Sequence, residues 1–211
     1  RDLISIQGQK VRIPIIHQID ILLDKYFTRK ADEFLTVSPT CNEKARSFYG
    51  KKVTTIYNGL TQGFSKNVDL TLRIKKLNVL YFGTLGVNRS PKIILEIFQD
   101  YIDFYQGIEI NVSFASKDNP TEYVNVTSIP NINLFWLGYL SKNELEIELM
   151  KSNALLLLED QSSAGDENLT GKVYEYISSK KPIIVSCSPT SDIVKLVNST
   201  NTGMNIRNKE M

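Results

Sequence analysis

The chain of 211 residues has little of several features that would direct it toward particular functions. Its two cysteines, Cys41 and Cys187, are far apart, and His17 is its single histidine, so a zinc site built from these residue types has too few ligands. We expect both thiols to be reduced and buried, as free cysteines usually are. An isolated histidine on an amphipathic stretch is expected to be structural. The sequence therefore predicts no metal site.

Strong net charge and long apolar runs are also missing. The formal net charge is +2 at pH 7, which gives no strong field toward nucleic acid or an anionic membrane. The apolar run over 154–158 is far shorter than the roughly 20 residues that cross a bilayer. The chain begins at Arg1, and its first residues lack the basic and then apolar order of a secretory signal. We expect part of a longer cytoplasmic protein that does not bind nucleic acid.

The sequence does contain the pattern of a parallel α/β fold. From residue 77 onward, short apolar runs rich in β-branched residues alternate with amphipathic stretches, which is typical of βα units around a parallel sheet. Several runs are almost continuously apolar, as expected for strands that helices cover on both faces. The expected strands are 77–83, 108–115, 132–138, 154–159, 182–187 and 203–206. The expected helices are 91–105, 141–150, 170–180 and 191–198, and Ser141 with Glu144 predicts a capping box at the start of the second.

The first 65 residues have a different arrangement. Their pattern predicts a long amphipathic helix over 15–29, a strand over 34–37, a helix over 39–48 and a strand over 53–57. Two strands are too few for us to expect a separate sheet there. Residues 60–76 contain glycine and a basic cluster, and we expect them to connect two domains.

Residues that follow the expected strands are the candidates for a binding site, because ligands of open parallel sheets bind outside the carboxyl ends of the strands. The connection over 160–170 is longer than the usual roughly 2–6 residues and is rich in small and acidic residues. It leads into a helix whose unpaired N–H groups, with Lys172 nearby, would attract a phosphate. Glu167 and Glu175 bracket the start of this helix, where one can accept hydrogen bonds from a sugar and the other can face the crevice.

A neighbouring loop carries further positive charge. The glycine-containing turn at 83–86 lacks the full Gly-x-Gly-x-x-Gly of a dinucleotide site. Arg89 and Lys92 follow this turn, and with Lys172 they place cations on two crevice loops, which is what a diphosphate needs. Taken singly, each of these charged residues could equally be an ordinary surface charge.

Five motifs in order resemble retaining glycosyltransferases of family four, which are two-domain enzymes with the GT-B fold. The most specific runs from Glu167 to Glu175 with the family's Glu-x(7)-Glu spacing, and Lys-Pro-Ile-Ile follows at 181–184. The other four are Ala-Asp-Glu-Phe-Leu-Thr-Val-Ser at 31–38, Ile-Tyr-Asn-Gly at 56–59, the segment 77–85, and Leu-Phe-Trp-Leu-Gly at 134–138. The resemblance implies the tail of an N-terminal acceptor domain and linker over 1–65, and a Rossmann-like nucleotide-sugar-binding domain over 66–211, truncated at its C-terminus.

The resemblance also implies roles for individual residues. Glu175 would bind the nucleotide ribose, and Glu167 would contact the donor sugar as the catalytic candidate. Thr84 stands where the family usually has a phosphate-binding arginine, directly after the first glycine, so Arg89 or Lys92 is expected to substitute. The remaining donor-binding candidates, which include the amides of the helix start and the residues beside the base, are Gly83, Leu169, Thr170, Gly171, Lys172, Tyr139 and Leu140.

Our leading hypothesis is a transferase that moves a sugar with retention from a nucleoside-diphosphate donor to a glycan or lipid-linked acceptor, as in polysaccharide biosynthesis. No metal or other cofactor is expected, because the cations and the helix N-terminus can stabilise the departing diphosphate. Most of the acceptor domain is missing, so we expect this fragment to be inactive alone. The resemblance allows peripheral association of the full-length enzyme with the inner face of the membrane.

Two other classes of protein fit the same pattern. A non-catalytic Rossmann-like binding or interaction module would keep the scaffold without transfer, since fold alone does not fix function. A flavodoxin-like or dinucleotide-binding protein is disfavoured, because the glycine fingerprint with an acid about 20 residues later is absent from the sequence.

Overall fold

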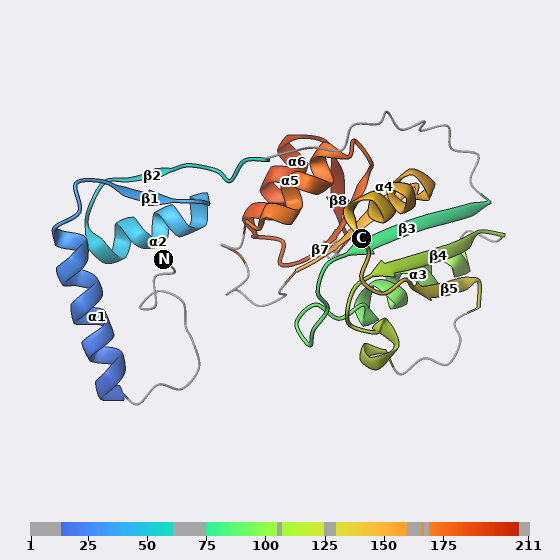
Figure 1. The fold of residues 1–211 in the computed structure, drawn as a ribbon, viewed down its shortest axis with the longest axis horizontal. Coiled ribbons are helices and arrows are strands. Elements are labelled where there is room, and N and C mark those ends of the chain that lie inside the picture. Colours follow the sequence, from blue (N-terminus) through green and yellow to red (C-terminus); the bar gives the residue numbers. More distant parts are fainter. Residues whose placement is uncertain are drawn as a thin grey trace.

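The computed structural model describes residues 14–60, 75–104, 107–124, 130–159, 166 and 169–206. The larger part of it is one parallel sheet of six strands with helices packed against it (Figure 1). All six predicted strands are confirmed to within two residues at either end. They are β3 (Lys76–Phe82), β4 (Glu109–Ala115), β5 (Ile132–Trp136), β6 (Ala154–Leu158), β7 (Ile183–Ser186) and β8 (Gly203–Asn205).

The order of the strands in this sheet is β5-β4-β3-β6-β7-β8, and every neighbouring pair is parallel. The chain moves outward from β3 to β5, returns to the other side of β3 as β6, and then moves outward again to β8. The strand order thus reverses between β3 and β6. In doubly wound sheets of this order, the crevice for ligands lies at that reversal, outside the carboxyl ends of the strands.

The four predicted helices of this part are also confirmed. Helix α4 begins with the predicted capping box: the side chain of Ser141 accepts a hydrogen bond from the N–H of Glu144 (3.4 Å), and the Glu144 carboxylate accepts one from the N–H of Ser141 (2.7 Å). A 3-10 helix, η1 (Pro120–Tyr123), lies between β4 and β5. The helices are α3 (Lys92–Phe104), α4 (Lys142–Lys151), α5 (Gly171–Ser178) and α6 (Asp192–Ser199).

Strand β6 carries the core on both of its faces, as its unbroken apolar sequence predicts. Leu155 and Leu157 belong to a buried cluster with side chains of α5 and α6. Leu156 and Leu158, which point the opposite way because side chains alternate along a strand, belong to a second cluster with side chains of α3. The first of these clusters fixes α5 next to the reversal in strand order.

The N-terminal segment contains the four predicted elements, α1 (Pro14–Arg29), β1 (Phe34–Thr36), α2 (Pro39–Tyr49) and β2 (Val53–Thr55). Our expectation that it forms no sheet of its own is wrong, because β1 and β2 pair in parallel. Helix α2 forms the connection between them, and the Asn42 side chain donates to the carbonyl oxygen of Val53 (3.1 Å). One βαβ unit is therefore enough for a two-stranded ladder.

Both cysteines are free thiols, as predicted. Cys187 is buried, but Cys41 is only partly buried, so the prediction of burial is wrong for Cys41. The reason is that α2 packs against a sheet of only two strands, and Ala45 is its one fully covered residue among those described.

Strands β3 and β6 pair along only part of their length. Their register joins Val79 with Ala154 and Leu80 with Leu155. Beyond these pairs, the buried hydroxyl of Tyr176 lies between the strands. It donates to the carbonyl oxygen of Leu156 (2.9 Å), lies 3.3 Å from that of Phe82, and accepts from the N–H of Phe82 (3.2 Å). The hydroxyl thus replaces the ladder bonds where the strands diverge.

Tyr176→Phe should lower the free energy of unfolding by about 1–3 kcal/mol, because buried backbone groups of β3 and β6 would lose their partner. Urea denaturation of the chain measures this loss. The matched control is Tyr174→Phe in the same helix, because the Tyr174 hydroxyl has no hydrogen-bond partner among the described residues. Equal losses in the two variants would contradict the bridging role of Tyr176.

Candidate functional site

The candidate site lies where the strand order reverses. Gly83 directly follows β3 and Glu159 directly follows β6, so both lie at the carboxyl edge of the sheet. The backbone of Gly83 has φ of 134°, a conformation that side chains other than glycine's rarely allow. Its N–H donates to the carbonyl oxygen of Ala115 (3.1 Å) on β4, which fixes where the following loop begins.

A buried carboxylate joins the two loops of the crevice. Glu159 is 1% exposed, and its Oε2 lies 2.7 Å from Nη2 of Arg89. The hydroxyl of Thr170 donates to Oε1 of the same carboxylate (3.3 Å), and Nη1 of Arg89 lies 3.5 Å from the Thr84 hydroxyl. Glu159 therefore holds the loop after β3 and the residue before α5 against each other.

Lys172, in the first turn of α5, extends toward Gly83. A Cβ atom on Gly83 would lie 2.3 Å from Nζ of Lys172, so a side chain at position 83 would displace the end of the lysine. The same Nζ lies 5.3 Å from the centre of the Tyr81 ring, within cation–π distance. Burial lowers the pKa of Lys172, an effect that Glu159 and Glu175 oppose and Arg89 increases.

The start of α5 has no side-chain cap among the described residues. Thr170 is the N-cap residue, with the extended backbone that this position requires, but its hydroxyl bonds to Glu159 rather than to the helix. The first N–H groups of a helix lack intrahelical partners and carry partial positive charge. Gly171, the first helical residue, is exposed. The N–H of Val173 already donates to the carbonyl oxygen of Thr170 (3.2 Å), which leaves those of Gly171 and Lys172 as the candidates to bind an anion.

Further hydrogen bonds fix the loop after β3. The Tyr81 hydroxyl donates to the carbonyl oxygen of Thr84 (2.5 Å), and burial raises the pKa of this phenol, which keeps it protonated. The carboxylate of Asp118 accepts from the N–H of Leu85 (2.9 Å). The N–H of Arg89 donates to the carbonyl oxygen of Gly86 (3.0 Å), which closes the turn. Arg89 is thus presented from a loop that is held at both ends.

The structure brings five of the predicted donor-binding residues together around Glu159: Gly83, Thr84, Arg89, Thr170 and Lys172. Glu175 is exposed on the same helix as Lys172. The predicted catalytic residue, Glu167, lies outside the described residues.

The side chains of four other predicted residues form no hydrogen bond or ion pair with this cluster in the described part of the chain. Lys92 is exposed at the first position of α3, and Tyr139 is 75% exposed, with Nζ of Lys117 5.4 Å from its ring centre. Leu140 packs against the core that contains α5. The side chain of Leu169 is 3% exposed and belongs to that core, so only its backbone amide is placed to bind the donor as predicted.

The sequence reasoning assigned no role to three residues that build the crevice, namely Glu159, Asp118 and Tyr176. Glu159 had a signal, because a carboxylate that directly ends a run of five buried residues needs a partner. Asp118 and Tyr176 act through contacts with residues that are far away in the sequence, and no local pattern marks them.

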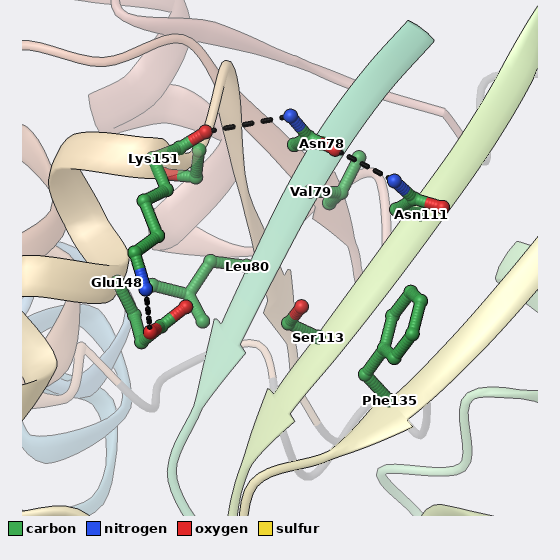
Figure 2. A pocket seen from close by; sticks show the side chains of 9 residues that line it. Asn78, Val79, Leu80, Asn111, Ser113, Phe135, Glu148 and Lys151 are labelled. Atoms are coloured by element: carbon green, nitrogen blue, oxygen red, sulfur yellow. Dashed lines mark hydrogen bonds and ion pairs between the residues drawn. The ribbon is translucent and has the colours of Figure 1, made fainter.

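A separate groove of about 190 Å³ lies on the face of β3, β4 and β5 beside α4 (Figure 2). The side-chain amides of Asn78 and Asn111 contact each other at 2.8 Å, and Glu148 forms an ion pair with Lys151 (2.6 Å). These polar groups already satisfy one another. Asn78 and Asn111 lie near the amino ends of their strands, so the groove is not at the crevice of the candidate site.

The described residues include no helix that is long and apolar enough to cross a membrane. Within the same residues, no three or more His, Cys, Asp or Glu side chains are grouped so that they could hold a metal ion.

The fold, a parallel α/β arrangement, is similar to that of solved glycosyltransferase structures. No protein-family model matches the sequence, and no curated protein matches it. Among solved structures, a mutant of S. aureus TarM in complex with Fondaparinux, alpha-GlcNAc-glycerol and UDP is 13% identical, with a TM-score of 0.61 over 91% of this chain and 37% of that chain.

Two further structures show the same likeness. The lipopolysaccharide outer core galactosyltransferase WaaB, in its apo form, is 19% identical, with a TM-score of 0.54 over 78% of this chain and 46% of that one. The pneumococcal O-GlcNAc transferase GtfA in complex with UDP and GlcNAc is 15% identical, with a TM-score of 0.51 over 78% of this chain and 32% of that one. This chain therefore spans less than half of each, and at these identities the likeness establishes the fold alone.

Glu159→Gln should lower the free energy of unfolding by about 1–3 kcal/mol, because it leaves Arg89 without its ionic partner. The loss should be smaller than for a fully buried pair, since the Arg89 side chain is 29% exposed. Urea denaturation measures it. The control is Glu148→Gln, whose partner Lys151 is 64% exposed, and there we expect about 0–1 kcal/mol. A loss at Glu159 no larger than at Glu148 would show that the buried pair does not hold the two loops.

Proposed function

We propose that this chain is the nucleotide-sugar-binding part of a glycosyltransferase and that the crevice between β3 and β6 holds the diphosphate of the donor. The observation that carries this proposal is the convergence of Arg89 and Lys172, from two different segments, around Glu159 at the reversal in strand order. Two cations with an uncapped helix start suit a ligand that carries several negative charges.

The chemistry of the crevice supports a diphosphate in particular. Sugar transfer leaves negative charge on the departing diphosphate, and fixed cations stabilise that charge best when they are already in place. Arg89 is held by Glu159 through Nη2, and a guanidinium has further N–H donors that a phosphate oxygen can accept. We propose that Lys172 and the first amides of α5 complete this phosphate site, so that no metal or other cofactor is needed.

The neighbouring parts of the donor are assigned by resemblance. Glu175 is exposed three residues after Lys172, so the two side chains lie on one side of α5, and it is proposed to accept hydrogen bonds from the ribose hydroxyls. Tyr139 offers an exposed aromatic ring for the base. Glu167 is proposed to contact the sugar. The TarM and GtfA structures named above contain UDP, which makes UDP the first nucleotide to test.

The acceptor side is proposed to involve residues 1–65. Three apolar side chains of helix α1 are exposed, Ile19 by 50%, Leu22 by 67% and Phe27 by 58%. Such an apolar surface favours the proposal that another part of a larger domain packs against this helix. We propose a glycan or lipid-linked acceptor, transfer with retention, and a cytoplasmic enzyme that can associate with the membrane surface. The alternative, a non-catalytic module of the same fold, should be indifferent to changes at Glu175.

The first prediction from this proposal concerns binding. In calorimetric titrations with UDP, GDP and ADP and their sugar conjugates, one nucleotide should bind saturably. Glu175→Ala and Lys172→Met should each weaken that binding about 10- to 100-fold, because each removes a hydrogen bond that involves a charged group. The controls Glu96→Ala, on an exposed position of α3, and Lys52→Met, in the N-terminal segment, should bind as the parent chain does. Equal binding by all four variants would contradict the assigned site.

The second prediction concerns pH. Only the protonated amine of Lys172 attracts phosphate, and burial holds the pKa of this lysine below its usual range. Nucleotide affinity should therefore fall as the pH rises from neutral through that lowered pKa. Titrations across this range with the parent chain and with Lys172→Met measure the effect. The proposal is wrong about Lys172 if the two proteins lose affinity in parallel.

A further inference from the structure

One buried carboxylate connects parts of the chain that are 152 residues apart. Asp192, the first residue of α6, is 2% exposed. Its Oδ2 accepts from the N–H of Thr40 (2.8 Å), and its Oδ1 accepts from the Thr40 hydroxyl (2.8 Å). Lys195, one turn further along α6, lies 3.0 Å from Oδ1 and donates to the Thr40 hydroxyl (3.3 Å). The carboxylate of α6 thus binds the N-terminal segment.

The position of Thr40 explains why this contact is specific. Thr40 is the second residue of α2, and its N–H is one of the donors that a helix start leaves without an intrahelical partner. Ser38 caps the same helix by accepting from the N–H of Cys41 (3.2 Å). Asp192 therefore supplies the next cap from another part of the chain. The N-termini of α2 and α6 both carry partial positive charge, and a carboxylate between them is stabilised by both.

The hydrogen bonds outweigh the cost of burying this charge. Burial alone would raise the pKa of the Asp192 carboxyl, but the bonds from Thr40, Lys195 and Ser38 hold the pKa below its usual range. Asp192 is therefore ionised at neutral pH, and each of its two carboxylate oxygens accepts a hydrogen bond from Thr40.

The same turn also contacts Asp166, a described residue of the connection between β6 and α5. The N–H of Asp192 donates to the carbonyl oxygen of Asp166 (2.9 Å), and the Thr190 hydroxyl donates to the Asp166 carboxylate (2.6 Å). Asp166 directly precedes Glu167, the proposed sugar contact. A single turn of the chain thus contacts both the N-terminal segment and the loop of the proposed donor site.

We propose that Asp192 is a positioning residue that ties the N-terminus of α2 to the turn anchoring Asp166, so that residues 14–60 and Asp166 of the donor loop keep one relative orientation. Asp192 does this through Thr40 on one side and through its own backbone N–H on the other. The part that concerns the donor loop rests on the proposed function. The part that concerns the orientation of the N-terminal segment does not.

The orientation is tested first, without any nucleotide. Spin labels on Ser47→Cys in α2 and Asn143→Cys in α4, in a Cys41→Ser background, report the distance between the two parts, since both label positions are exposed. The parent should give one narrow distance distribution. Asp192→Ala should broaden it strongly, and Thr40→Val, which removes only the hydroxyl bond, should broaden it less.

Two controls separate this role from general stability. Lys151→Met removes an exposed cation from the i,i+3 ion pair of α4 and leaves every contact of Asp192 in place, so the distribution should stay narrow. Thr54→Val makes the same chemical change as Thr40→Val at an exposed position of β2 and should also leave it narrow. If Asp192→Ala and Thr40→Val give the parent's distribution, the proposed tie between the two parts is wrong.

Calorimetric titration of the same variants with UDP then tests the loop. Both Asp192→Ala and Thr40→Val should weaken UDP binding about 3- to 10-fold, although neither residue is proposed to touch the nucleotide. UDP binding that is equal in the parent and in both variants would overturn the coupling to the loop. If the parent binds no nucleotide, the proposed function and the loop part fail together, while the distance measurement still decides the orientation part.

Discussion

The candidate site depends on one hydroxyl group. Tyr176 occupies the place where β3 and β6 stop pairing, and its bonds to Leu156 and Phe82 let the two strands diverge without leaving buried backbone groups unsatisfied. Because Tyr176 belongs to α5, the same bonds fix this helix over the opening between the strands. Lys172 and Glu175 lie on α5, so their positions follow from where the Tyr176 ring is buried. Two strands that diverge within a buried sheet thus require a polar bridge between them.

Two buried carboxylates, Glu159 and Asp192, hold other segments of the chain together. Glu159 keeps Arg89 in the crevice and offsets the repulsion between Arg89 and Lys172, which would otherwise be two like charges near one buried edge. Asp192 performs a comparable task at the boundary with the N-terminal segment, where it satisfies the start of α2. Each carboxylate is buried where two segments meet, and each is compensated by a cation together with neutral donors. These ionic and hydrogen-bonded contacts fix how the segments meet, because apolar packing does not select one pair of polar partners.

The sequence was sufficient to predict the strands and helices, because their signals are local. The apolar run of β6 and the capping box at Ser141 are each contained within a few residues. It also predicted that Arg89 and Lys172 lie near each other, since both follow strands whose carboxyl ends must lie together, but it added Lys92, which forms no bond with them in the described part of the chain. The ion pair of Arg89 with Glu159 and the contact of Thr40 with Asp192 were not predicted, because each joins residues that only the tertiary fold brings together.

The packing of Lys172 against Gly83 has a consequence for how this chain can evolve. Two independent constraints act on position 83, since a side chain there would meet the lysine and would also need a backbone conformation that suits glycine alone. Shortening residue 172 relieves the first constraint and leaves the second. The two positions are therefore constrained unequally: a change at position 172 puts no strain on the backbone of Gly83, whereas a side chain at position 83 is strained by the backbone whatever residue stands at position 172.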